Sequence, residues 1–178
     1  MGTYNRYPLT LVSGKGCWVR DHKGHRYLDA VAGIATCTLG HSNPALRRAL
    51  KDQLSRLQHV SNLYAIPEQE ELARWLVNNS CADSVFFCNS GAEANEAAIK
   101  LARKHGHQRR RIERPVILTA AASFHGRTLA AVSATGQPRY HVGFEPMVEG
   151  FETFTYNDIK SFELLLNRLE AHGPRVCA

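Results

Sequence analysis

The sequence predicts an α/β protein with a mainly parallel sheet and helices on both faces. From about residue 84 onwards, short apolar segments alternate with segments of helical periodicity. The connections between them are short, which is typical of parallel strands joined by crossover helices. A chain of 178 residues with 44% apolar and 21% charged residues is also large enough to bury a core.

The first third of the chain is less regular. Residues 17–20 and 25–28 alternate in polarity around Gly24 and predict a β-hairpin. Asn43 followed by Pro44 predicts a helix start. The apolar face of that helix would consist of Leu46, Ala49, Leu50, Leu54 and Leu57. A second helix opens at Pro67, and its inward side chains would be Leu72, Trp75 and Leu76.

The α/β pattern proper then follows. Its elements are a strand at 84–88, a helix at about 91–105, a strand at 115–121 and a helix at about 127–134. Asp158 caps a last helix, whose packed side chains would be Phe162, Leu165, Leu166 and Leu169. Residues 174–178 have the pattern of the start of a buried strand. We therefore expect the chain to be part of a longer protein, with a truncated sheet.

The helix start near residue 90 is a candidate phosphate site. Ser90 and Glu93 have the spacing of a capping box. Gly91 and Ala92 would leave backbone N–H groups uncovered at the positive end of the helix dipole, an arrangement that binds phosphate. The small face turned to the sheet would consist of Ala94, Ala97, Ala98, Leu101 and Ala102. The alternative is a well-capped crossover helix without a ligand.

Residues 123–128 form a second candidate constellation, at the carboxyl edge of the sheet where open α/β sheets bind ligands. Phe124 and His125 offer rings to a flat ligand, and Arg127 offers a planar fork to a carboxylate. The alternative is a core Phe beside a surface Arg.

Charge and composition argue against several functional classes. The net charge is +6, but the basic run 109–111 lies between a predicted helix and strand without interleaved aromatic residues, so we expect no nucleic-acid binding. The five cysteines lack metal or disulfide spacing, and the histidines form no ligand motif, so we expect reduced thiols and no metal. No apolar run reaches membrane-spanning length. A cytoplasmic protein without a membrane or nucleic-acid partner is expected.

Several motifs carry a family resemblance. Residues 89–100, 123–128 (Ser-Phe-His-Gly-Arg-Thr) and 134–137 (Ala-Thr-Gly-Gln) resemble the class III pyridoxal-phosphate-dependent aminotransferases, nearest to their acetylornithine-specific branch. The same holds for the Gly, Val, Asp and Tyr pattern over 14–29 and for residues 32–35, 39–41 and 61–64. The resemblance covers nearly the whole chain and implies the aspartate-aminotransferase-type fold, known as fold type I.

The resemblance also implies roles for individual residues. Ser90, Gly91 and Ala92 would hold the phosphate of pyridoxal 5'-phosphate, and Phe124 would stack on its pyridine ring. Arg127 would pair with the α-carboxylate of the amino-acid substrate. Residues 61–64 would lie near the active site of a homodimer, and His125 would shape the pocket without transferring protons.

Two further implications concern the extent of the chain. Residues 1–45 would be the N-terminal segment of a small domain, and residues 46–178 the first portion of the large cofactor-binding domain. The lysine that forms the Schiff base with the cofactor would lie beyond Ala178, because no lysine of this chain has its sequence context. No catalytic residue is therefore assigned here, and the 178-residue chain alone is expected to be inactive.

The implied reaction moves the δ-amino group of N-acetylornithine to 2-oxoglutarate, a 2-oxo acid, in arginine biosynthesis. Ornithine-specific relatives are expected to carry a hydroxylated aromatic residue where this chain has Ile34, which suits an acylated donor better than a free ammonium. The open alternatives are succinylornithine, ornithine or 4-aminobutyrate as donor, or an inactive gene fragment.

Overall fold

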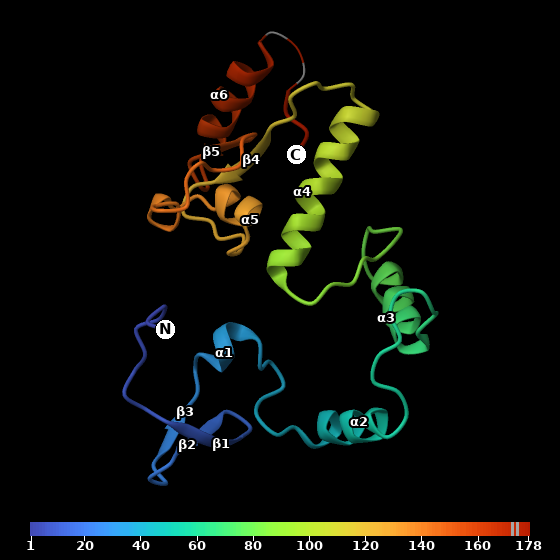
Figure 1. The fold of residues 1–178 in the computed structure, drawn as a ribbon, viewed down its shortest axis with the longest axis vertical. Helices are drawn as coiled ribbons and strands as arrows, with labels where there is room; N and C mark the ends of the chain where they lie inside the picture. The colour runs from blue at the N-terminus through green and yellow to red at the C-terminus, as the bar shows by residue number, and fades with distance from the viewer. Residues whose placement is uncertain (172, 174) are drawn as a thin grey trace. The chain divides into compact units, whose positions relative to one another are not determined.

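The computed structural model describes residues 1–171, 173 and 175–178. By their internal contacts these residues divide into two compact units, an N-terminal unit, Met1–Leu72, and a C-terminal unit, Ala73–Ala178. The ribbon in Figure 1 is coloured along the chain, so that the N-terminal unit is blue to green and the C-terminal unit is green to red.

The N-terminal unit contains a three-stranded antiparallel sheet of order β1-β2-β3, built from β1 (Leu11–Lys15), β2 (Trp18–Asp21) and β3 (Arg26–Leu28). The predicted hairpin is confirmed as β2 and β3, whereas β1 was not predicted. The buried carboxylate of Asp21 closes the hairpin, because its Oδ1 accepts the backbone N–H groups of Lys23 and His25 at 2.9 and 2.8 Å. Gly24 has a φ of 89°, as the turn requires.

Two longer helices follow the short α1 (Ala32–Ala35), and they begin where the sequence predicts. In α2 (Pro44–Leu54), Asn43 Oδ1 accepts the N–H groups of Ala45 and Leu46. The helix α3 spans Pro67–Asn78. Their predicted apolar faces are not buried: Leu46, Leu50, Leu54 and Leu57 are 47–62% exposed, and Leu72 and Trp75 are 49% and 61% exposed. The periodicity is correct, but no described element covers these faces.

The sheet of the C-terminal unit is parallel, as predicted. Strand β4 (Ile117–Ala120) pairs with β5 (Phe151–Phe154), from Ile117 opposite Phe151 to Ala120 opposite Phe154. The last residues, 175–178, extend along the other edge of β4, where Leu118 donates to the Ala178 carbonyl at 2.8 Å. Residue 174 of the predicted terminal strand lies outside the described residues, and the remainder pairs as expected.

Helices cover both faces of this sheet, which confirms the α/β prediction. Ile99 of α4 (Gly91–Gln108) and Ala134 of α5 (Leu129–Ala134) form the core with Ile117 and the partly buried Phe151. On the opposite face, Phe154 contacts Phe162 of α6 (Ile159–Glu170), with ring centroids 5.4 Å apart. Because alternate strand residues point to opposite faces, Phe151 and Phe154 mark the two layers.

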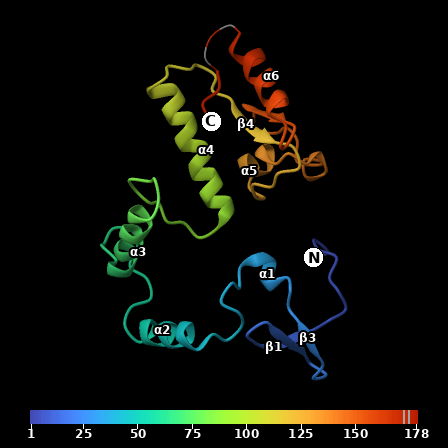
Figure 2. The same ribbon diagram turned by 180° about the vertical axis from the view of Figure 1, so that it is seen from behind.

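One prediction about this unit is wrong, and another is correct only for Ala102. Residues 84–88 are not a strand, because no described backbone group pairs with them. The face of α4 turned to the sheet carries Asn95, Ile99, Ala102 and Gly106, whereas Leu101 is 69% exposed. Gly106, on the observed inward face, lies close to the chain end, because an added Cβ would lie 3.0 Å from Cys177 Cβ. Figures 1 and 2 accordingly show the chain end between α4 and β4.

Candidate active site

The N-terminal end of α4 has the properties of an anion site. Ser90 Oγ caps the helix by accepting the Glu93 N–H at 3.2 Å, while the Glu93 carboxylate accepts the Asn89 N–H at 2.6 Å. The predicted capping box is thus present, with its return bond displaced by one residue. The N–H groups of Gly91 and Ala92 have no acceptor among the described residues, and a Cβ on Gly91 would meet open space. They lie at the positive end of an 18-residue helix.

The loop after β4 lies directly against this helix end. A Cβ on Gly126, whose φ is 132°, would lie 2.8 Å from Ala92 Cβ. Asn95 donates its side-chain amide to the His125 carbonyl at 2.8 Å. The structure therefore brings the two predicted motifs, residues 89–102 and 123–128, into one place.

Residues 134–137 hold the loop from its other side. Thr135, only 1% exposed, accepts the His125 N–H at 3.0 Å, and Gln137 donates to the Ser123 carbonyl at 3.0 Å. Gly136 leaves no room for a side chain, because a Cβ there would lie 2.2 Å from the Ala120 carbonyl oxygen. The loop is fixed by buried and backbone-directed contacts, so its exposed side chains are preorganised.

Those exposed side chains are aromatic and cationic. Phe124 is 56% exposed and contacts Tyr140 of the short 3-10 helix η1 (Pro138–Tyr140) edge-on, with centroids 6.1 Å apart. The guanidinium of Arg127 lies 4.2 Å from the Tyr140 ring centroid and 5.6 Å from that of Phe124. Arg127 is exposed, and no described carboxylate forms an ion pair with it. Its planar fork is available to a ligand carboxylate.

Sequence reasoning missed three residues that shape this site. Glu96 accepts both the Thr128 hydroxyl and the Ala131 N–H, so it ties α4 to the start of α5. Tyr140 and Asn95 support Arg127 and the loop backbone as described above. The sequence does contain an indication of Asn95 and Glu96, because they are two polar residues in a helix segment whose other residues on that side are small or apolar.

The N-terminal unit contains the remaining predicted positions. Ile34 lies in α1 with its side chain 86% exposed, and Leu63 and Tyr64 of the segment 61–64 are 85% and 68% exposed. Within the described residues, no group of three or more His, Cys, Asp or Glu side chains is placed to hold a metal ion. Nor does any described helix combine the length and apolarity needed to cross a membrane.

The C-terminal unit therefore fits a flat, phosphorylated ligand together with a carboxylate. The uncovered N–H groups of Gly91 and Ala92 suit a phosphate, the exposed Phe124 ring suits an aromatic system, and Arg127 suits a carboxylate. All three lie on the helix end and loop that Gly126 and Asn95 join.

Comparison with known proteins finds similar chains. The chain is 76% identical over all its residues to the acetylornithine aminotransferase of Prochlorococcus marinus (strain MIT 9313), and 78% identical to that of Parasynechococcus marenigrum (strain WH8102). It spans 43% and 42% of those two relatives. Among solved structures, the ornithine aminotransferase of Toxoplasma gondii ME49 matches all of this chain and 41% of its own, with a TM-score of 0.92 and 29% identity.

The family model of the class-III aminotransferases matches residues 2–176. The matched range includes both the helix end and the loop that form the site. This chain belongs to the class-III aminotransferase family.

Proposed function

We propose that this chain forms the N-terminal part of an acetylornithine aminotransferase, which transfers the δ-amino group of N-acetylornithine to 2-oxoglutarate in arginine biosynthesis. Close relatives with that name support the assignment, and the chain spans about 43% of their length. The structural observation that carries the proposal is the contact between Gly126 and Ala92, because it joins a phosphate-binding helix end to a carboxylate-binding arginine.

Class-III aminotransferases use pyridoxal 5'-phosphate. When bound, this group supplies an electron sink for the carbon that carries the amino group. Ser90, Gly91 and Ala92 would bind its phosphate through a hydroxyl and two backbone N–H groups. Phe124 would pack against the ring, and the rigid loop behind it would keep that contact in place.

Arg127 would bind and orient the carboxylate of the amino-acid or 2-oxo-acid substrate. A guanidinium that stacks on Tyr140 keeps its N–H edge free for a bidentate pair. Orientation of the substrate matters for the rate, since a misplaced reacting atom is costly.

The choice of amino donor rests on Ile34. Its exposed side chain offers no hydrogen bond, so it would favour a donor whose α-amine is acylated over one with a free ammonium. Succinylornithine shares the acyl cap and remains an alternative. Ornithine and 4-aminobutyrate are further alternatives.

The wider assignments belong to the same proposal. Residues 1–45 would belong to a small domain and residues 46–178 to the large domain of a cytoplasmic homodimer, without a nucleic-acid or membrane partner. The absence of a nucleic-acid partner is supported by one contact of the basic run 109–111. Arg110 donates to the Val176 carbonyl at 2.5 Å, so this side chain has a structural role.

A competition assay tests the function. The protein is a complete subunit in which this chain is followed by the C-terminal remainder of the Prochlorococcus marinus relative. We expect kcat/KM to be highest for N-acetylornithine among acetylornithine, succinylornithine, ornithine and 4-aminobutyrate. A preference for free ornithine over both acylated donors would contradict the proposal.

A further inference from the structure

The backbone of residues 32–35 is unusual, because all four residues have positive φ. The values are 48° for Ala32, 64° for Gly33, 62° for Ile34 and 59° for Ala35. A run of this kind is a left-handed turn, which side chains with a Cβ disfavour and β-branched ones disfavour most. Only one of the four residues is a glycine. Such a turn persists when the surrounding contacts over-determine it.

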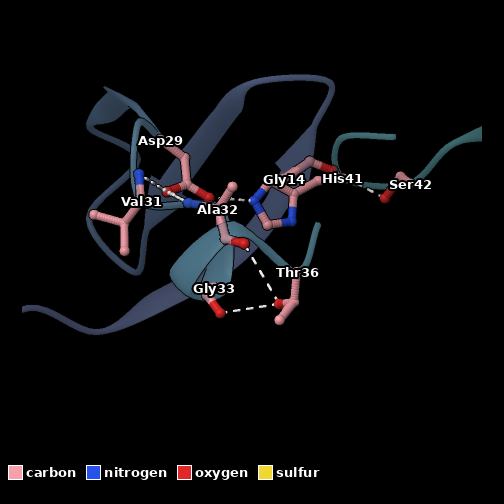
Figure 3. A network of polar contacts seen from close by, with 8 residues as sticks. All are labelled: Gly14, Asp29, Val31, Ala32, Gly33, Thr36, His41 and Ser42. Atoms are coloured by element: carbon pink, nitrogen blue, oxygen red, sulfur yellow. Dashed lines mark hydrogen bonds and ion pairs between the residues drawn. The ribbon is translucent and has the colours of Figure 1, made fainter. Parts of the chain in front are cut away.

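The contact that organises the turn comes from Asp29. Its Oδ1 accepts the N–H groups of Val31 and Ala32 at 3.2 and 2.8 Å, and its Oδ2 lies 2.6 Å from His41 Nε2 (Figure 3). The two carboxylate oxygens thus join the entry of the turn to a histidine 12 residues further along the chain. The bond to His41 is the largest cause of a lowered pKa for Asp29. An ionised carboxylate accepts this hydrogen bond, with the ring nitrogen of His41 as the donor.

His41 is itself fixed to the sheet. It exchanges two backbone hydrogen bonds with Gly16, at 2.8 and 2.9 Å. Its ring lies over Gly14, where an added Cβ would be 2.7 Å from the ring Cγ. Ser42 adds a bond from its hydroxyl to the Gly14 carbonyl at 2.9 Å. The imidazole is therefore a rigid link between β1 and the carboxylate that shapes the turn.

This arrangement presents Ile34 without burying it. Its side chain is 86% exposed, so it contributes almost no packing within the N-terminal unit that could offset the backbone strain. Thr36 closes the far end of the turn by donating its hydroxyl to the Gly33 carbonyl at 2.9 Å. A strained turn that displays an apolar side chain is typical of a functional position.

We propose that Asp29 and His41 are positioning residues which hold the left-handed turn 32–35 and thereby place Ile34 against the acyl cap of the amino donor. This inference rests on the proposed function for the identity of the donor. Neither residue touches substrate or cofactor in this role, since both act through the backbone of the turn.

The test uses His41→Phe in the complete subunit described above. Phenylalanine keeps a ring over Gly14 but removes the nitrogen that bonds Asp29. His25→Phe is the matched control, because His25 also pairs with an aspartate, Asp21, at 3.0 Å in the same unit without touching the turn. His41→Gln, which retains a side-chain donor, is the conservative variant.

Hydrogen exchange provides a readout that does not depend on the substrate. The amides of Thr36 and Cys37 both donate to the Ala32 carbonyl at 2.9 Å, so they report on the turn. We expect their exchange to be about tenfold faster in His41→Phe, within about twofold of the parent in His25→Phe, and closer to the parent in His41→Gln. Unchanged exchange in His41→Phe would overturn the proposal.

The kinetic readout is the ratio of kcat/KM for acetylornithine to that for ornithine. We expect His41→Phe to lower this ratio by about tenfold and His25→Phe to leave it within about twofold. Faster exchange with an unchanged ratio would show a purely structural pair and overturn the positioning role. A parent subunit that prefers ornithine would instead refute the proposed function, and the exchange measurement would still decide whether the pair holds the turn.

Discussion

At the scale of single residues, the sequence indicates which side chains could bind a ligand. It does not indicate which distant residues hold those side chains in place through hydrogen bonds and ring contacts. Gly91, Phe124 and Arg127 can be singled out from the sequence, because an uncovered helix end, an aromatic ring and a planar fork each suit one part of a ligand. Their ligand roles stay predictions. Glu96 and Tyr140 were missed, because their roles depend on contacts with Thr128 and Arg127 that exist only in the folded chain.

Replacing Arg127 tests the carboxylate role. In the complete subunit, Arg127→Lys is expected to raise KM for the amino donor by about tenfold, since a point charge replaces a bidentate, charge-assisted pair. Cofactor affinity should stay within about twofold. The control is Arg139→Lys, because Arg139 also lies over Tyr140, at 4.8 Å, but bonds Gln137 instead of standing free. An unchanged KM in Arg127→Lys would remove it from the substrate site.

Replacing Gly91 tests the phosphate role. We expect Gly91→Val to weaken pyridoxal 5'-phosphate binding by about tenfold, since a branched side chain would obstruct approach to the N–H groups. The position itself has space for a Cβ, so the fold should tolerate the change. Ala98→Val, on an exposed part of the same helix, controls for the lower helix propensity of valine. Cofactor titration of the apoenzyme measures both, and equal affinities would place the phosphate elsewhere.

At the scale of elements, the sequence predicts helices and turns well, because their backbone hydrogen bonds form between residues close in the sequence. The caps at Asn43 and Asp158 located α2 and α6, and Gly24 located the hairpin. The strand predicted at 84–88 is absent, because a strand needs a neighbouring strand to pair with, and an apolar run does not indicate whether one is present. The inward face of α4 was predicted only in part, since its contacts, such as the close approach at Gly106, are made by residues distant in the sequence.

The junction between α4 and the loop depends on Gly126. Gly126→Ala is expected to lower stability by about 2–3 kcal/mol, because the new methyl group collides with Ala92 and the backbone has positive φ. Gly143→Ala separates these two causes, since Gly143 also has positive φ, 84°, but has open space around it. Denaturant titration of both variants measures the difference. Equal losses of stability would show that the collision with Ala92 adds no cost to that of the positive φ.

The stability of the hairpin should decrease at low pH. Burial raises the pKa of Asp21, but hydrogen bonds from the His25 side chain and backbone, from Tyr27 and from Lys23 outweigh it and hold the pKa at about 2. Because this pKa lies below the ordinary 3.8, the stabilisation is present above pH 3.8 and is lost as the pH falls towards 2. The amide resonances of Lys23 and His25 should shift in that window. In Asp21→Asn the shift should be absent, and its persistence would assign the transition to another group.

At the scale of the whole chain, the apolar faces that periodicity predicts remain uncovered, so this chain alone displays a surface that globular proteins normally bury. The periodic pattern identified the apolar faces of α2 and α3, but the expected burial of their side chains is not observed within the described residues. It could not show whether these faces are covered, because burial depends on tertiary contacts, and the described residues form none that cover them. Exposed apolar side chains occur in both units. More than half of each of these residues is exposed: Leu50 and Leu54 in α2, Trp75 in α3 and Leu101 in α4.

The 178-residue chain by itself should therefore bind hydrophobic dyes and self-associate. Exposed apolar helix faces of this kind drive association in water. We expect strong fluorescence of an anilinonaphthalene sulfonate dye and species larger than a monomer by sedimentation velocity. The complete subunit, assembled with the remainder of a relative of which this chain spans 43%, should bind far less dye per residue. If the isolated chain instead sediments as a monomer without dye binding, its leucine and tryptophan faces are covered by contacts within the chain itself.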